Sequence, residues 1–118
     1  MVRDRILRHF PHPVFDEVAG AYFRKTLELA RDEGVSLIVV RFPETTEYFQ
    51  ASRDFIQRAR VEERLATILA DHPEVTVVDA RLDYAAKPDL FMDPDHLSGR
   101  GARRFTRRLR AVVEAGEG

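Results

Sequence analysis

Two short apolar segments, Ser36–Phe42 and Val75–Asp79, constrain the fold of this 118-residue chain more than any other feature. The first is rich in β-branched residues and apolar at successive positions, which is typical of a strand buried on both faces of a parallel sheet. The second has the same character and ends in a carboxylate. Because parallel strands need long crossover connections, usually helices, the two segments predict an α/β fold.

Helical patterns flank both predicted strands. Apolar residues recur at helical spacing over residues 14–33, and Gly34 is expected to stop that helix. A second helical stretch covers residues 48–71, with a break expected near Arg58–Glu62, where charge is dense. A last helix is expected to start at Ser98 or shortly after and to fray over residues 115–118. Its inward stripe is expected to be Ala102, Phe105, Leu109 and Val112.

The order of these elements bears on domain organisation. Residues 1–13 are expected to form an irregular arm, because Pro11 and Pro13 disfavour a helix there. Residues 14–118 are expected to form one domain, since helix, strand, helix, strand, loop, helix is the order of a doubly wound parallel sheet. Two strands are few for such a sheet. Either the arm supplies a strand, or a partner does, or the chain belongs to a larger fold; an open sheet edge can also pair with a second copy.

Composition excludes several classes of function. Apolar residues make up 44% and charged residues 33%, a globular profile. The net charge of -1 gives no reason to expect nucleic acid or an anionic membrane as a partner. There are no cysteines, which removes disulfides, thiolate zinc sites and cysteine nucleophiles. The longest apolar run, Leu37–Val40, is too short to span a bilayer.

The last predicted helix carries a basic face. Such a face can bind the phosphates of nucleic acid. No aromatic side chains interleave it, and acidic residues elsewhere balance its charge, so we expect a solvated face that holds salt bridges. Nucleic-acid binding is the alternative, and it requires a steep salt dependence. The face consists of Arg100, Arg103, Arg104, Arg107, Arg108 and Arg110.

The segment Phe91–Ala102 is the most informative for chemistry. Asp93 and His96 lie three residues apart on a loop that Pro94 stiffens. A turn there brings the carboxylate onto one ring nitrogen and leaves the other nitrogen to take a proton, as in the base of a hydrolytic triad. On spacing alone, the alternative is a turn capped by Asp93 beside an ordinary surface histidine. The side chain of Asp95, between the two, is expected to be solvated.

Four further residues have expected roles near this segment. Ser98 is expected to cap the last helix, and Gly101 to allow the start of that helix to approach a neighbouring segment closely. Glu44 and Thr45 follow the first strand, at the edge where ligands bind in open α/β sheets, so they are expected to contact substrate. A polar loop that only faces solvent is the alternative for these two. His9 and His12 have the spacing of a metal pair but no visible third partner, so no metal is expected.

The same segment resembles a known family. The run Phe91-x-Asp93-x-x-His96-Leu97-Ser98-x-x-Gly101-Ala102-x-x-Phe105-Thr106 is similar to the closing block of the SGNH/GDSL hydrolase superfamily. It is closest to the polysaccharide O-acetyltransferase and alginate-acetylation-like branch. The resemblance implies a three-layer α/β/α sandwich, flavodoxin-like, with a short parallel sheet. It also implies that His96 is the base and Asp93 orients it.

The resemblance also implies a class of reaction. It implies ester hydrolysis or acyl transfer on a carbohydrate-like hydroxyl, through a serine acyl-enzyme. That chemistry runs on a nucleophile, a base and an oxyanion hole, so neither an organic cofactor nor a metal is implied. Relatives of this branch imply an extracytoplasmic parent protein.

The chain departs from the family at the nucleophile. The family's serine stands upstream in a Gly-Asp-Ser-like block, and no such block occurs here, nor any asparagine for the oxyanion hole. The serines Ser36, Ser52 and Ser98 fall at a strand start, in a helix and at a helix cap. We therefore expect the C-terminal portion of an ester hydrolase or O-acyltransferase, inactive as this chain alone. The alternative is a non-catalytic binding or interaction domain with the same fold.

Overall fold

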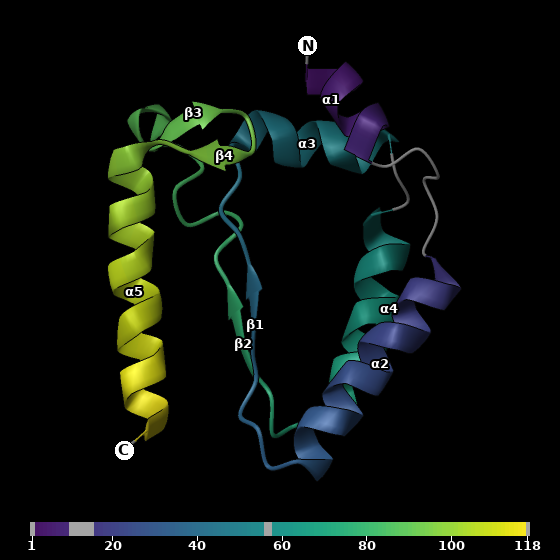
Figure 1. Cartoon of the computed structure of the whole chain (residues 1–118). Coiled ribbons are helices and arrows are strands. Elements are labelled where there is room, and N and C mark those ends of the chain that lie inside the picture. The colour runs from purple at the N-terminus through teal and green to yellow at the C-terminus, as the bar shows by residue number, and fades with distance from the viewer. Residues whose placement is uncertain (1, 10–15, 56–57, 118) are drawn as a thin grey trace. The chain divides into compact units, whose positions relative to one another are not determined.

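The computed structural model describes residues 2–9, 16–55 and 58–117, and the chain forms two compact units (Figure 1). The first unit comprises Met1–Arg41 and Gln50–Asp79, and the second comprises Phe42–Phe49 and Ala80–Gly118. Helices and strands both occur, which confirms the mixed α/β class. The expectation of a single domain over residues 14–118 stays a prediction. None of the described helices is both long and apolar enough to cross a membrane.

The N-terminal residues form a helix, so the expectation of an irregular arm is wrong for them. Helix α1 spans Val2–His9, and Val2 and Ile6, one turn apart, are both buried. Burial of that pair favours a helix, and Pro11 lies beyond its last residue and so does not interrupt it. Residues 10–13 lie outside the described residues. So do the side chains of His9 and His12, whose expected lack of a metal stays a prediction.

Helix α2, Glu17–Asp32, begins and ends where its capping residues place it. The Asp16 carboxylate accepts hydrogen bonds from the backbone N–H groups of Val18 and Ala19, at 3.0 and 3.1 Å. Gly34 has a φ of 69°, the left-handed conformation that ends helices. The predicted stop at Gly34 is therefore confirmed.

The predicted stretch over residues 48–71 consists of two helices, α3 (Thr46–Phe55) and α4 (Arg58–Ala70). Residues 56–57, between them, lie outside the described residues. The dense charge at Arg58–Glu62 therefore falls in the first turns of α4 rather than in a break. Two ion pairs join α2 to α4 and to the turn that follows it: Arg64–Glu17 and Arg24–Asp71, both at 2.6 Å.

The two predicted strands pair in parallel, as expected. Strands β1 (Ile38–Arg41) and β2 (Thr76–Asp79) align residue for residue (Figure 1). The expected burial on both faces is wrong: every residue of β1 is only half-buried, and Val77 is 43% exposed while Val78 is 7% exposed. Side chains alternate between the faces of a strand, so Val77 and Val78 lie on opposite faces, and only Val78 is buried. Within the described part of the chain, each strand pairs on one edge only.

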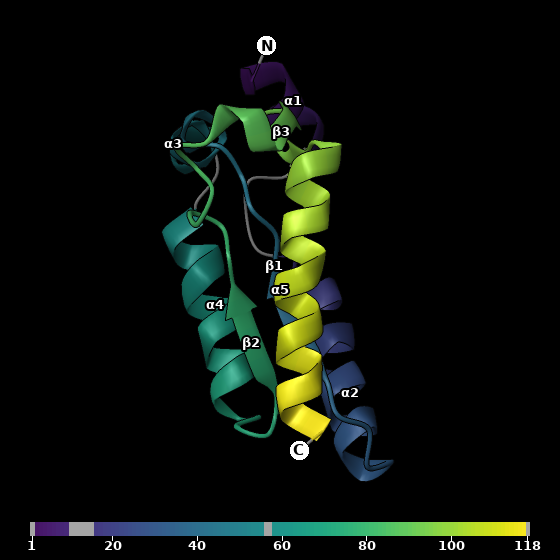
Figure 2. The same cartoon turned by 90° about the vertical axis from the view of Figure 1, so that its left-hand side faces the viewer.

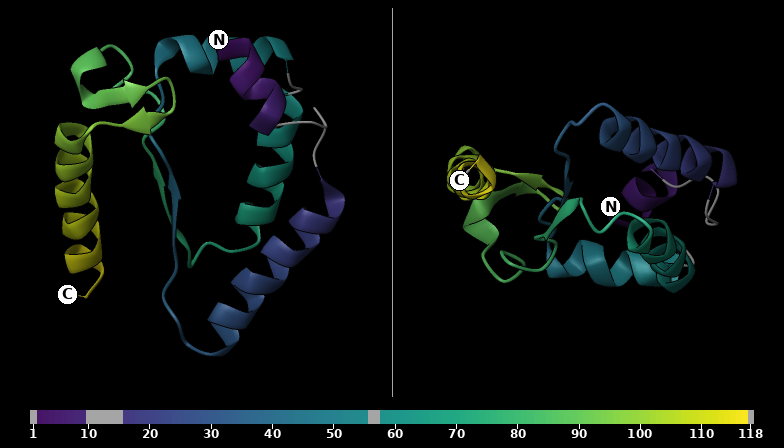
Figure 3. Two further views of the ribbon diagram at one scale, coloured as in Figure 1. Left: turned by 45° about the horizontal axis from the view of Figure 1, so that its top comes forward. Right: turned by 90° about the horizontal axis from the view of Figure 1, so that it is seen from below.

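The second unit is built around helix α5, Gly99–Glu117, a single unbroken helix (Figure 2). The expected fraying is therefore wrong for residues 115–117. At its N-terminal end lie the short helix η1 (Pro88–Leu90) and strands β3 (Phe91–Asp93) and β4 (His96–Leu97), as Figure 3 shows. The sequence predicts a loop over this stretch, and the hairpin formed by β3 and β4 is a finding of the structure.

One face of α5 forms the core of the second unit. Phe105 is buried and packs edge-on against Tyr84 and Phe42, with ring centroids 6.2 and 5.6 Å away. Leu109 and Val112 of the predicted stripe are half-buried. Ala102 is exposed, so its predicted place in the stripe is wrong. The apolar stripe is therefore narrower than expected, with Phe105 buried and with Leu109 and Val112 half-buried.

The basic side of α5 holds salt bridges, as the sequence predicts. Arg108 donates to Asp83, and this hydrogen bond raises the pKa of the Arg108 guanidinium above its usual value. Arg104 lies over the ring of Tyr84, 5.3 Å from its centroid. Two further pairs are Arg100–Asp89 at 3.2 Å and Arg110–Glu114 at 2.8 Å.

Candidate functional site

The candidate site is the turn of the β3–β4 hairpin. Asp93 ends β3, His96 begins β4, and the two face each other in the antiparallel register across the turn Pro94–Asp95. The backbone N–H of Asp95 donates to Oδ1 of Asp93 at 3.2 Å. A carboxylate that bonds the backbone two residues on stabilises a tight turn. The local sequence thus closes the turn that brings the two side chains together.

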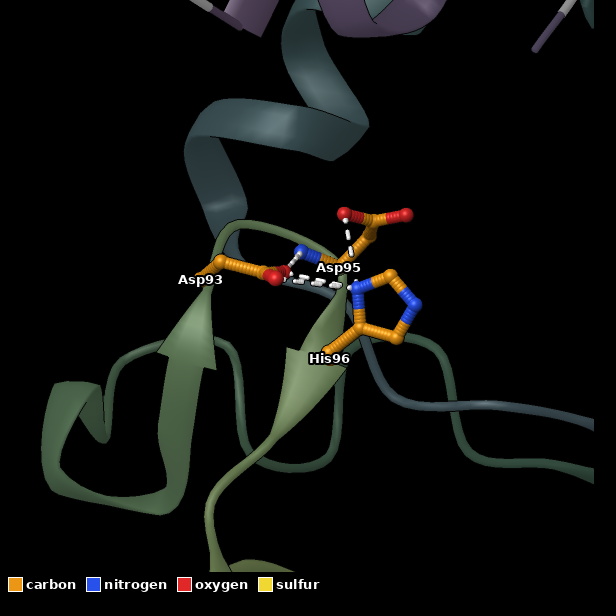
Figure 4. Close-up of side chains that lie close together, drawn as sticks. All are labelled: Asp93, Asp95 and His96. Atoms are coloured by element: carbon orange, nitrogen blue, oxygen red, sulfur yellow. Dashed lines mark hydrogen bonds and ion pairs between the residues drawn. The ribbon is translucent and has the colours of Figure 1, made fainter.

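Asp93 and His96 form the pair that the sequence predicts. The imidazole Nδ1 lies 2.8 Å from Oδ1 of Asp93 and 3.1 Å from its Oδ2 (Figure 4). The other ring nitrogen, Nε2, points away from the carboxylate. The His96 side chain is 59% exposed, whereas that of Asp93 is 26% exposed. The pair therefore presents a ring fixed at Nδ1 with Nε2 on its accessible side, the arrangement that lets a histidine accept a proton.

Asp95 belongs to the same cluster, against the sequence expectation that it is solvated. Its Oδ1 lies 3.4 Å from Nδ1 of His96, and its side chain is only 14% exposed. The reason is the two-residue turn, which directs the Asp95 carboxylate toward the Nδ1 edge of the ring (Figure 4). Sequence spacing could not predict this direction, because it depends on the backbone angles of the turn.

Thr45 is part of the site through its contact with the hairpin turn. Its backbone N–H and its hydroxyl both donate to the carbonyl oxygen of Pro94, at 3.0 and 2.8 Å. The hydroxyl oxygen also accepts from the N–H of Tyr48, at 3.2 Å, which caps α3. The predicted substrate-binding residue therefore lies against the Asp93–His96 turn, where its hydroxyl is already bonded to backbone.

The backbone of Glu44 bonds to the segment that follows β2. Its backbone N–H donates to the carbonyl oxygen of Arg81 at 3.0 Å, and its side chain is half-buried and has further interactions. Its expected role in binding substrate stays a prediction.

Ser98 and Gly101 connect the hairpin to α5. The Ser98 hydroxyl accepts from the N–H of Gly101 at 3.1 Å and donates to the carbonyl oxygen of Asp89 at 3.0 Å. A Cβ on Gly101 would lie 2.1 Å from the carbonyl oxygen of Leu90, which no side chain can tolerate without movement of the backbone. Only glycine fits this close approach. Both residues therefore hold β4 and the start of α5 against η1.

None of the serines is placed as a nucleophile beside a base in the described residues. The Ser98 hydroxyl is engaged as a helix cap. Ser52 is fully buried in the first unit, where Arg58 donates to its hydroxyl. Ser36 is exposed just before β1. Among the described residues, Asp93 and His96 thus form a pair on one turn, while the hydroxyls of Ser98 and Ser52 bond to other partners.

The donor atoms at this turn also include a set that could coordinate a cation. One ligand atom each from Asp93, Asp95 and His96 lie within 4.8 Å of one another. Carboxylate and imidazole ligands suit several divalent metals. Exposed acidic groups commonly cluster without an ion, so the set by itself does not indicate a metal centre.

Comparisons with protein-family models, with curated proteins and with solved structures find no match for this chain.

Proposed function

We propose that this chain provides the Asp–His part of a serine ester hydrolase or O-acyltransferase that acts on an acylated, carbohydrate-like substrate. One observation carries the proposal: Nδ1 of His96 is held by Asp93 at 2.8 Å, while Nε2 points away from it on an exposed ring. The histidine base of such an enzyme needs one ring nitrogen held by a carboxylate and the other able to accept a proton. Asp93 is the orienting carboxylate and His96 the base.

The reaction needs a serine from outside these residues. Nε2 of His96 takes the hydroxyl proton as the serine oxygen attacks the ester carbonyl, and the protonated ring returns that proton to the departing alcohol oxygen. Water or a second hydroxyl then attacks the acyl-serine, with the same ring first accepting and then returning a proton. Hydrolysis results in the first case and acyl transfer in the second.

The proposal also includes a more specific fold than the general α/β class. We assign the chain to the C-terminal portion of a three-layer α/β/α sandwich of SGNH type. In support, β1 and β2 are parallel, and parallel sheets are normally covered on both faces by helices. Here one face of β2 is open at Val77, and each strand pairs on one edge only within the described residues. Further strands and a further layer would complete such a sheet.

The test uses 4-nitrophenyl acetate, an activated ester that an exposed imidazole can attack without a serine. We expect slow hydrolysis by the wild type that falls several-fold in His96→Ala, because the accessible Nε2 is lost. His72→Gln is the matched control, since His72 is 2% exposed and cannot reach the ester. Equal rates in wild type and His96→Ala would overturn the proposal.

A non-catalytic binding or interaction domain with the same fold is the second candidate. It is favoured by the engagement of Ser98 as a cap and the burial of Ser52, which leave no serine beside the base in the described residues. This candidate predicts that an O-acetylated oligosaccharide shifts the NMR signals of His96 and Thr45 without being hydrolysed, whereas the deacetylated oligosaccharide does not.

A further inference from the structure

Two carboxylates, not one, face the same nitrogen of His96. Asp93 Oδ1 lies 2.8 Å and Asp95 Oδ1 lies 3.4 Å from Nδ1, and the two carboxylates approach this nitrogen from different directions (Figure 4). The shorter contact is a hydrogen bond, and the longer one is an electrostatic contact. Neither carboxylate is directed toward Nε2.

The position of Asp95 is fixed by the backbone. Its own N–H is bonded to Asp93, and the carbonyl oxygen of the preceding residue, Pro94, accepts two hydrogen bonds from Thr45. These bonds engage both the carbonyl oxygen and the N–H of the peptide group between Pro94 and Asp95, and so restrain it. With its side chain 14% exposed, Asp95 is shielded from water that would otherwise weaken its interaction with the ring.

Neutral imidazole carries one proton, on either nitrogen, and its surroundings decide which. A proton on Nδ1 meets one acceptor, Asp93, and the negative charge of Asp95, whereas a proton on Nε2 leaves a lone pair on Nδ1 facing two negative charges. We propose that Asp95 is a positioning residue, which acts with Asp93 to hold the proton of neutral His96 on Nδ1 and so keeps Nε2 as the proton acceptor.

The consequence for catalysis rests on the proposed function, whereas the preference for a proton on Nδ1 does not. With the proton on Nδ1, every neutral ring has an Nε2 lone pair ready for a hydroxyl proton. Without Asp95, a fraction of the rings carries the proton on Nε2 and cannot act as the base. Asp95 therefore determines the fraction of neutral His96 rings that can act as the base, and it does so without contact with substrate.

The experiment is ¹⁵N NMR of the histidine side chains at a pH where the rings are neutral. We expect the wild type to show His96 as the Nδ1–H tautomer, and Asp95→Asn to lower the ratio of Nδ1–H to Nε2–H several-fold. Asp93→Asn should lower it further, because Asp93 makes the shorter contact. Asp32→Asn is the matched control: it makes the same charge change on an exposed residue of α2 and should leave the ratio unchanged.

An unchanged tautomer ratio in Asp95→Asn, with the hairpin intact, would overturn the inference. Hairpin integrity is read from cross-strand contacts between Phe91 and Leu97. If Asp95→Asn loses those contacts, Asp95→Glu decides, since it keeps the charge: a retained Nδ1–H tautomer supports the inference, and a mixture overturns it. The two tests are independent of each other. An unchanged tautomer ratio in Asp95→Asn would not alter the hydrolysis result, and equal hydrolysis rates in wild type and His96→Ala would not alter the tautomer ratio.

Discussion

Within the residues that the structure describes, the β3–β4 hairpin and the β1–β2 sheet each have two strands, but they are held in different ways. The hairpin is closed by hydrogen bonds within Asp93–His96 and by the bonds from Thr45 to Pro94. The sheet has regular parallel pairing, yet Val77 is open to solvent and one face of β2 lacks cover. A short turn can be specified by its own side chains, whereas a parallel sheet depends on the layers around it.

The largest expected effect tests the two faces of β2. Val78→Ala should lower the free energy of unfolding by about 2–3 kcal/mol, because it removes methyl groups from a buried position. Val77→Ala, the neighbouring residue on the open face, should change it by less than about 0.5 kcal/mol. Urea unfolding followed by circular dichroism measures both. Equal losses would mean that both faces are covered and that the contrast with the hairpin is unfounded.

The next effect concerns the junction of the hairpin with α5. Gly101→Ala should destabilise the protein by about 1–3 kcal/mol, since its Cβ would meet the Leu90 carbonyl oxygen. Gly116→Ala, in the same helix with no atom near its Cβ, should instead be neutral or stabilising by up to about 1 kcal/mol. Thermal unfolding of the two variants gives the comparison. Similar shifts of both midpoints would contradict the close approach at Gly101.

A smaller effect tests the anchor of the turn. Thr45→Val removes the hydroxyl bonded to Pro94 and Tyr48 and should cost about 1 kcal/mol. It should also broaden the NMR signals of Asp95 and His96, because the turn loses one of its restraints. Thr106→Val, on the exposed face of α5, is the matched control. Unchanged signals in Thr45→Val would show that the turn needs no support beyond its own residues.

The smallest effect lies in the turn before β2 and depends on pH. The hydrogen bond with His72 Nδ1, at 2.8 Å, holds the pKa of Glu74 below its ordinary value of 4.5. A lowered carboxyl pKa contributes stability above pH 4.5, and this contribution is lost as the pH falls through the folded-state value. Glu74→Gln should therefore be slightly less stable than wild type at neutral pH, and the difference in urea midpoint should vanish in acid. A difference that grows on acidification would contradict the sign.

The regular elements were predictable where a local signal is strong. The two β-branched runs predict a parallel pair, and Gly34 predicts the end of α2, because each depends on its own backbone preferences. The burial of β1 was not predictable, since it depends on which layers lie over the sheet. The helix α1 was missed because Pro11 limits only where a helix ends, and the burial of Ile6 cannot be read from the sequence.

The candidate site was predictable in part. The spacing of Asp93 and His96 predicts their contact, because both lie on one tight turn. Strands as short as β3 and β4 carry no periodic pattern, so the hairpin that orients them was missed. The contact between Thr45 and Pro94 joins residues far apart in the sequence, and no local rule predicts it. The inward direction of Asp95 depends on the same turn geometry.

The most direct test asks whether this chain contains a base without a nucleophile of its own. A fluorophosphonate, which reacts with activated serines, is incubated with wild type and His96→Ala, and adducts are located by intact mass and peptide mapping. We predict no adduct on Ser36, Ser52 or Ser98 in either protein. An adduct on one serine of the folded wild type that disappears in His96→Ala would contradict the proposal and place a complete site within these residues.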